Sequence, residues 1–163
     1  MKINLYALRA IYLHEMDRFR RTLTQSVLSP VLTTSLYFIV FGSVIGGYVE
    51  KIDGISYGSY IVPGLLMLTL LTQSISNTSF GIFFPKFNGT IYEILAAPIS
   101  TLEVVLAFVG AGATKTLIVS IIIFITSLFF VDVQVKYPLL MIFLLILVAF
   151  TFALFGFLIG LIS

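Results

Sequence analysis

Four long apolar stretches, separated by three short polar connectors, occupy most of this 163-residue chain. Hydrophobic residues make up 60% of the sequence and charged residues only 10%, whereas soluble domains carry about a quarter charged residues. The chain therefore has too little polar surface to cover a water-soluble globule. Since an apolar stretch of about 20 residues crosses a bilayer as a helix, we predict an all-α integral membrane protein with four transmembrane helices.

The predicted spans form a transmembrane domain over residues 26–163, at about residues 26–47, 60–84, 101–131 and 138–162. We expect Gly46-Gly47 to end the first span and Pro85 to end the second, because neither residue type favours continuing a helix. Pro30 is expected to start the first span or to kink it. The chain stops about a residue after the fourth span, so a truncated chain is one interpretation.

Residues 1–25 are charged throughout and carry an apolar stripe at helical spacing, which is typical of an amphipathic helix. The stripe comprises Leu5, Leu8, Tyr12, Met16, Phe19 and Leu23. Next to a membrane span, such a basic helix normally lies in the interface plane; the alternative is a solvated leader helix packed on nothing.

The distribution of basic residues predicts the topology. The N-terminal segment holds five of them: Lys2, Arg9, Arg18, Arg20 and Arg21. Because Lys and Arg concentrate on the cytoplasmic side, we expect a multi-pass protein of the cell (inner) membrane with a cytoplasmic N-terminus. The loop at residues 85–100 is then cytoplasmic, and residues 48–59 and 132–137 lie outside.

The loop at residues 85–100 carries two helix-start signatures. Thr90 with Glu93, and Ser100 with Glu103, both have capping-box spacing, and Pro98 disfavours helix at the residue before it. We therefore predict a short helix over residues 91–97. Its Ile91, Tyr92, Ile94 and Leu95 are too apolar for a solvated loop, so the helix lies on the lipid surface or docks into a cytoplasmic partner.

The second span has an unusually polar interior that includes Gln73 and Asn77. Unsatisfied polar groups are costly in lipid, so these residues are expected to bond to other helices or to line a pathway. Lys115 lies well inside the third span, where three interpretations stay open. It snorkels to the headgroups, faces anionic cargo in a dimer cavity, or bonds to Gln73 or Asn77. Gly156 and Gly160 form a GxxxG pair, which indicates dimerisation only weakly.

Several kinds of chemistry are not expected in this chain. With no Cys and one His, no metal site of those ligands is predicted. The sequence lacks the G-x-x-x-x-G-K-(S/T) phosphate loop of ATPases, so we predict no enzyme and no cofactor in the chain itself. An ion-driven carrier usually needs an Asp, Glu or His at membrane depth, and none is expected here. No nucleic-acid partner is expected either.

Residues 89–100, GTIYEILAAPIS, resemble the GT-(L/I)-x-x-(L/I/V)-L-x-x-P-(I/V)-S segment of ABC-2 type transporter permeases, the membrane subunits of ABC exporters. Residues 60–66, YIVPGLL, are similar to the opening of the second span in that family. The acidic residue of the family often stands one place earlier, where this chain has Tyr92. Family members usually have six spans, so the chain resembles their N-terminal four-span portion.

The resemblance implies a mechanism. Two permease copies, as a homodimer in the bilayer, would work with cytoplasmic ABC ATPase subunits, which bind ATP and Mg²⁺. The resemblance implies that the short helix couples to the ATPase through Thr90, Ile91, Tyr92, Glu93, Ile94, Leu95 and Pro98. It also implies an interface helix with Arg9, Arg18, Arg20 and Arg21, and a translocation path that includes Lys115, Gln73 and Asn77. The alternatives are a truncated, non-transporting membrane fragment and an ion-driven secondary transporter.

Overall fold

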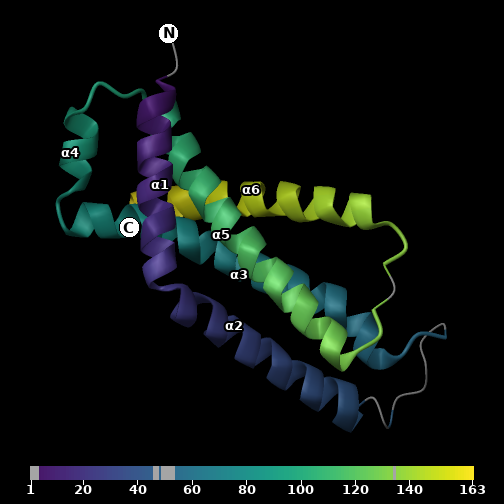
Figure 1. Cartoon of the computed structure of the whole chain (residues 1–163). Coiled ribbons are helices and arrows are strands. Elements are labelled where there is room, and N and C mark those ends of the chain that lie inside the picture. The colour runs from purple at the N-terminus through teal and green to yellow at the C-terminus, as the bar shows by residue number, and fades with distance from the viewer. Residues whose placement is uncertain (1–3, 46–47, 49–53, 134) are drawn as a thin grey trace.

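The computed structural model describes residues 4–45, 48, 54–133 and 135–163, with the backbone alone for residues 42, 43 and 45. Lys2 and the predicted helix end at Gly46-Gly47 lie outside these residues. The elements of the described part are all helices (Figure 1): α1 (Leu5–Arg21), α2 (Leu23–Tyr37), the π-helix η1 (Phe38–Ile45), α3 (Tyr57–Phe87), α4 (Ile91–Ala96), α5 (Thr101–Phe130) and α6 (Pro138–Ile162). Four helical segments are long and apolar enough to cross a membrane: Leu23–Phe41, α3, α5 and α6. The predicted all-α fold with four such helices is confirmed.

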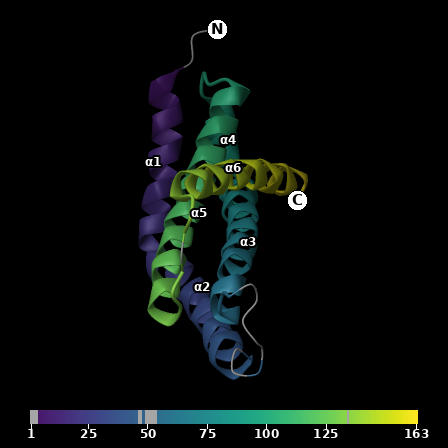
Figure 2. The same ribbon diagram turned by 90° about the vertical axis from the view of Figure 1, so that its right-hand side faces the viewer.

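Helix α5 is the most buried of the four and lies at the centre of the fold. One apolar cluster joins it to α3 and α6 through residues such as Leu70, Phe108 and Phe157. A second cluster joins it to α1, η1 and α3 through Phe19, Phe38 and other residues. Helix α6 crosses α3 and α5 rather than lying parallel to them (Figure 1, Figure 2).

Helix α1 packs along the first half of α5 and runs in the same direction. Three polar contacts join the two helices: the Asn4 N–H donates to Glu103 Oε1 (2.5 Å), the Tyr12 hydroxyl to Thr114 Oγ1 (3.1 Å), and Lys115 Nζ to Glu15 Oε2 (2.7 Å). The residue numbers rise together on both helices, which fixes their parallel register. The interpretation of α1 as a leader helix packed on nothing is therefore wrong, because its partner is α5.

Helices α3 and α6 approach closely because α6 presents glycine where they cross. A Cβ on Gly156 would lie 2.5 Å from the carbonyl oxygen of Ile75, and one on Gly160 would lie 2.7 Å from that of Ser79. The Ser74 hydroxyl donates to the Ala149 carbonyl across the same contact (2.6 Å). The GxxxG pair is thus occupied by a helix of the same chain.

Two proline expectations need correction. Helix α2 begins at Leu23, so Pro30 lies in its interior and does not start it. Helix α3 continues through Pro85 to Phe87; proline has a helical φ, and near the end of a helix few residues follow the hydrogen bond that it interrupts. The end of α3 comes from Asn88-Gly89: Gly89 has a φ of +79°, the left-handed conformation that commonly follows the last helical residues.

Candidate functional site

Helix α4 connects α3 to α5 and has two faces. Ile91 and Ile94 pack against the apolar cluster of α3, α5 and α6, whereas Tyr92 and Leu95 are 72% and 67% exposed. Residues three apart share one side of a helix, so the inward pair anchors α4 and the outward pair is free for contact. Figure 1 shows α4 at the periphery of the fold, away from the loop that joins α5 to α6.

Only one of the two predicted capping boxes forms. Thr90 has helical backbone angles and makes no side-chain capping hydrogen bond; its hydroxyl lies 3.4 Å from the Pro85 carbonyl instead. The Thr90 prediction is wrong because the chain enters α4 from a tight turn at Gly89, already in helical conformation. The Ser100–Glu103 capping box is confirmed, with both of its hydrogen bonds present.

The segment between α4 and α5 is extended around Pro98. Ala97, which precedes it, has φ −73° and ψ 149°, as expected for a residue before proline. Helix α4 therefore ends at Ala96, one residue earlier than predicted. The exposed Glu93 and Pro98 lie on this side of the molecule together with Tyr92 and Leu95.

The four arginines of α1 have different surroundings. Arg9, Arg20 and Arg21 are exposed, and Arg20 lies 4.0 Å from Asp17 on the surface. Arg18 is half-buried: it lies 3.5 Å from Glu15 and its guanidinium sits 4.8 Å above the ring of Phe84 on α3. Arg18 therefore belongs to the inner face of α1, and the other three to its outer face.

Lys115 is buried and forms an ion pair with Glu15, which is also buried. Its Nζ lies 2.7 Å from Glu15 Oε2, so its partner is on α1, which none of the three sequence interpretations includes. Gly81 of α3 faces the pair, since a Cβ there would lie 3.4 Å from the same carboxylate oxygen. One sequence signal could have found Glu15: it lies three residues after Tyr12 and four before Phe19, on their side of the helix.

The polar residues of α3 divide between bonded and open positions. Ser74 and Thr78 are fully buried and hydrogen-bonded to backbone carbonyls. The Asn77 amide donates to Thr116 Oγ1 of α5 (3.3 Å) and also lines a cavity of about 430 Å³ beside the ion pair. Gln73 does not lie with Lys115; it lines a separate cavity of about 310 Å³ between α2 and α3, with Ser29, Thr33, Thr34, Thr69 and Thr72.

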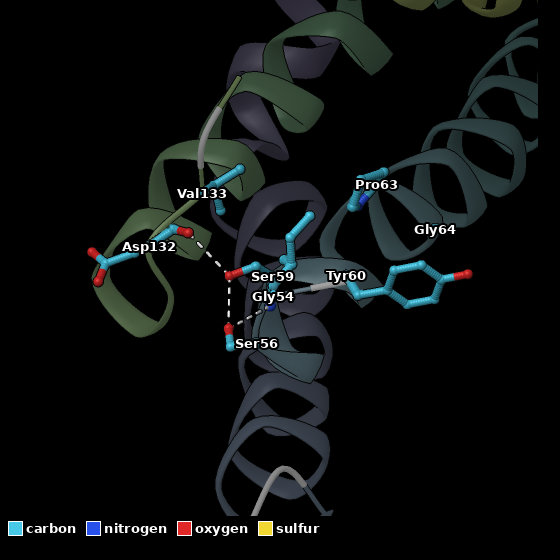
Figure 3. A pocket seen from close by; sticks show the side chains of 9 residues that line it. Gly54, Ser56, Ser59, Tyr60, Pro63, Gly64, Asp132 and Val133 are labelled. Carbon is cyan, nitrogen blue, oxygen red and sulfur yellow. Dashed lines mark hydrogen bonds between the residues drawn. The ribbon is translucent and has the colours of Figure 1, made fainter. Parts of the chain in front are cut away.

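A third polar cavity, of about 810 Å³, lies where α3 begins and α5 ends (Figure 3). The hydroxyls of Ser56 and Ser59 are 2.8 Å apart, and Ser59 donates to the Asp132 carbonyl (3.0 Å). The carboxylate of Asp132 is exposed at its rim. Polar cavities therefore occur at several levels along α3.

The described residues offer no metal-binding cluster, since no three His, Asp or Glu side chains among them come together. The arrangement combines an exposed apolar face on α4 with hydroxyl-, amide- and charge-lined cavities along α3. Such cavities in an apolar fold are suited to binding and passage of polar groups, because irregular polar surface inside a membrane is tolerated where it lines a wet cavity.

Comparison with known proteins shows the family of the chain. The model of the ABC-2 type transporter family matches residues 6–163. Proteins named inner membrane transport permease YadH, from Escherichia coli K12 and from Shigella flexneri, are each 39% identical over 154 residues, which cover 94% of this chain and 60% of theirs. No solved structure gives a significant match. The chain thus spans about three fifths of the length of these relatives, and it belongs to the ABC-2 type transporter family.

Proposed function

We propose that the chain is the membrane-spanning permease subunit of an ABC exporter, which moves substrate out of the cytoplasm with ATP hydrolysed by a separate subunit. The observation that carries the proposal is the pair of exposed side chains on α4, Tyr92 and Leu95, on a helix anchored from its other side by Ile91 and Ile94. Adjacent exposed apolar and aromatic residues are the kind of surface that contacts a protein partner or a membrane, and the polar connector that holds α4 favours the protein partner. ATP and Mg²⁺ would bind to the partner, and a second permease copy would complete the path.

The proposed location is the inner membrane with the N-terminus in the cytoplasm. Support comes from the name of the YadH relatives and from Arg9, Arg18, Arg20 and Arg21, whose concentration before the first span favours the cytoplasmic side. With this topology α4 faces the cytoplasm, where an ATPase subunit is found. The arginines on the outer face of α1 are available to anionic headgroups or to the same partner.

Charged substitutions on α4 test the proposal. Tyr92→Asp and Leu95→Asp should abolish co-purification of the ATPase subunit and ATP-dependent export, because a buried unpaired carboxylate at an interface is strongly unfavourable. The matched control is Tyr137→Asp, a tyrosine 64% exposed in the connector before α6. Normal ATPase recovery and export in the α4 variants, with intact helical content, would overturn the coupling role of this helix.

The same measurements separate this function from the two alternatives. An ion-driven carrier would keep transport after loss of the ATPase, and would require a carboxylate that changes its protonation state. Glu15 is a buried carboxylate, and it lies in an ion pair with Lys115. A non-transporting fragment would show neither ATPase recovery nor export in the unmodified protein.

A further inference from the structure

The cavity of about 430 Å³ beside the Glu15–Lys115 pair lies between the end of α1, the start of α2 and the facing sides of α3 and α5. We call it the charged pocket. Its lining comprises Glu15, Arg18, Phe19, Thr22, Gln25, Ser26, Ser76, Asn77, Phe80, Phe84 and Lys115. Helices α2 and α3 have almost no contact with each other, so the pocket is open between them.

The three charged groups in the lining do not cancel. Glu15 lies 2.7 Å from Lys115 and 3.5 Å from Arg18, so one carboxylate is shared by two cations. The pocket therefore carries one excess positive charge. Lys115 and Glu15 are at most 6% exposed, whereas the side chain of Arg18 is 36% exposed, so the excess charge lies at the more open side of the pocket.

A buried ion pair is weak evidence for stability, because desolvation offsets most of the attraction and apolar residues of similar volume often serve as well. The position of this pair supports a binding role instead. It forms one wall of a cavity, and Gly81 leaves room for its carboxylate next to α3. Within the described part of the chain, the Gln25 amide and the Ser76 hydroxyl of the lining make no intramolecular hydrogen bond, so their donors are available to a ligand.

The remaining lining is aromatic and leads out of the pocket. Phe19 is buried, whereas Phe80 and Phe84 are 54% and 42% exposed on the outer side of α3. An occupant would thus have its charged group near Arg18 and Lys115 and its apolar part along the phenylalanines. This combination fits an amphiphile and does not fit a small inorganic ion.

We propose that the charged pocket binds the headgroup of a singly charged anionic lipid, with its phosphodiester between Arg18 and Lys115 and its acyl chain over Phe80 and Phe84. The Gln25 amide and the Ser76 hydroxyl donate hydrogen bonds to the remaining phosphate oxygens. Binding of the lipid does not require that the lipid be transported. The proposal can therefore be tested independently of the function proposed above.

The chain contains no Trp, so the fluorescence of one introduced Trp is measured as the difference from the complex with the unmodified chain. Phe80→Trp places one at the pocket mouth, and Phe155→Trp on α6 is its control: both phenylalanines are 54% exposed and both pair with another phenylalanine at 5.9 Å. The permease, purified from its native membrane with its partners, is mixed with neutral-detergent micelles containing brominated phosphatidylglycerol or brominated phosphatidylcholine of the same chain length. In the Phe80→Trp variant we expect phosphatidylglycerol to quench the indole fluorescence at a mole fraction roughly tenfold lower than phosphatidylcholine, since one unit of charge acts at close range. The Phe155→Trp variant should show no preference between the two lipids.

Charge variants at two other positions of the lining then test the mechanism without removing either member of the buried pair. In the Phe80→Trp background, Gln25→Lys should raise the apparent affinity for phosphatidylglycerol severalfold, and Gln25→Glu and Arg18→Gln should each lower it to the phosphatidylcholine level. Equal quenching by the two lipids, or affinities that do not follow the charge, would refute the proposal. Competition by water-soluble glycerophosphoglycerol as strong as that by the lipid would also refute it, because the site would then bind a free phosphodiester and not an amphiphile.

Discussion

The crossing of α3 and α6 gives the sharpest prediction on stability, because it depends on backbone distances. In the Gly156→Ala variant the new Cβ would lie 2.5 Å from the carbonyl oxygen and 2.8 Å from the Cα of Ile75. Ordinary contacts of a Cβ begin at 3.4 Å, so the helices must separate by roughly 1 Å to relieve the overlap. No flexible side chain is available to move aside, since the contacted atoms are backbone.

The expected loss has two parts. Overpacking that shifts the backbone costs about 1–3 kcal/mol. Separation of the helices also stretches the 2.6 Å hydrogen bond from Ser74 to the Ala149 carbonyl, which is worth about 0.5–1.5 kcal/mol. The higher helix propensity of alanine offsets about 1 kcal/mol of this, so the free energy of unfolding should fall by about 0.5–3.5 kcal/mol.

The control is Gly110→Ala on α5, where a Cβ meets no atom within 4 Å. This variant keeps only the propensity gain and should be about 0.5–1 kcal/mol more stable than the unmodified protein. Both free energies are measured by unfolding the purified protein in mixed micelles with increasing dodecyl sulfate, followed by circular dichroism. If Gly156→Ala proves as stable as Gly110→Ala, the close crossing of α3 and α6 is refuted. If Gly156→Ala changes the oligomer size but not the free energy of unfolding, the GxxxG pair lies in a dimer contact instead.

Two further predictions use the same unfolding measurement and hydrogen exchange. Lys115→Leu removes the closer partner of the buried Glu15 and leaves it only the half-buried Arg18 at 3.5 Å, so the free energy of unfolding should fall by about 3 kcal/mol. The double variant Glu15→Leu/Lys115→Leu should recover most of the loss. A double variant as unstable as the single one would contradict a direct pair. Ser100→Ala removes the cap of α5, so amide exchange in residues 101–104 should become faster, with a loss of about 1 kcal/mol in the free energy of protection. Thr90→Ala should have little effect on amide exchange in α4. Equal effects at the two sites would contradict the observed difference in capping.

The sequence predicts the helices well and their contacts poorly, for a physical reason. Apolar runs and local caps act within a few residues, so the spans and the Ser100–Glu103 capping box could be predicted from neighbours alone. Glu15 and Lys115 are 100 residues apart, and only the packing of α1 on α5 brings them together. The partner of the GxxxG pair is similarly decided by tertiary structure, since a small-residue face on α6 fits a helix of the same chain as well as one of a second copy.

Two predictions made from local sequence signals, the helix end at Pro85 and the cap at Thr90, are wrong because Gly89 nearby in the chain has a stronger effect on the backbone. Pro85 favours an end of α3, but the helix continues for two more residues to Phe87 and ends at the turn of Asn88 and the left-handed Gly89. Thr90 has the right spacing to Glu93 for a cap but the wrong backbone, because the turn at Gly89 delivers the chain to α4 already in helical angles. A cap requires an extended residue, as Ser100 is, with ψ 150°.

The carboxylate of Glu103 links the start of α5 to the start of α1, close to the end of α4. One oxygen of its carboxylate accepts the Ser100 N–H and so completes the cap of α5, and the other accepts the Asn4 N–H at the start of α1. A displacement of α4 would therefore reach α5 through the short extended segment at Pro98 and reach α1 through the same carboxylate. Tyr12 and Glu15 join α1 to α5 further along, and the charged pocket lies where these two helices face α2 and α3. The Ser100→Ala variant keeps both backbone N–H donors of the Glu103 carboxylate and removes only the bond from the Glu103 N–H to the Ser100 hydroxyl. It tests this link through fraying of the first turn of α5, which would displace Glu103 and speed amide exchange at the start of α1 as well as at the start of α5.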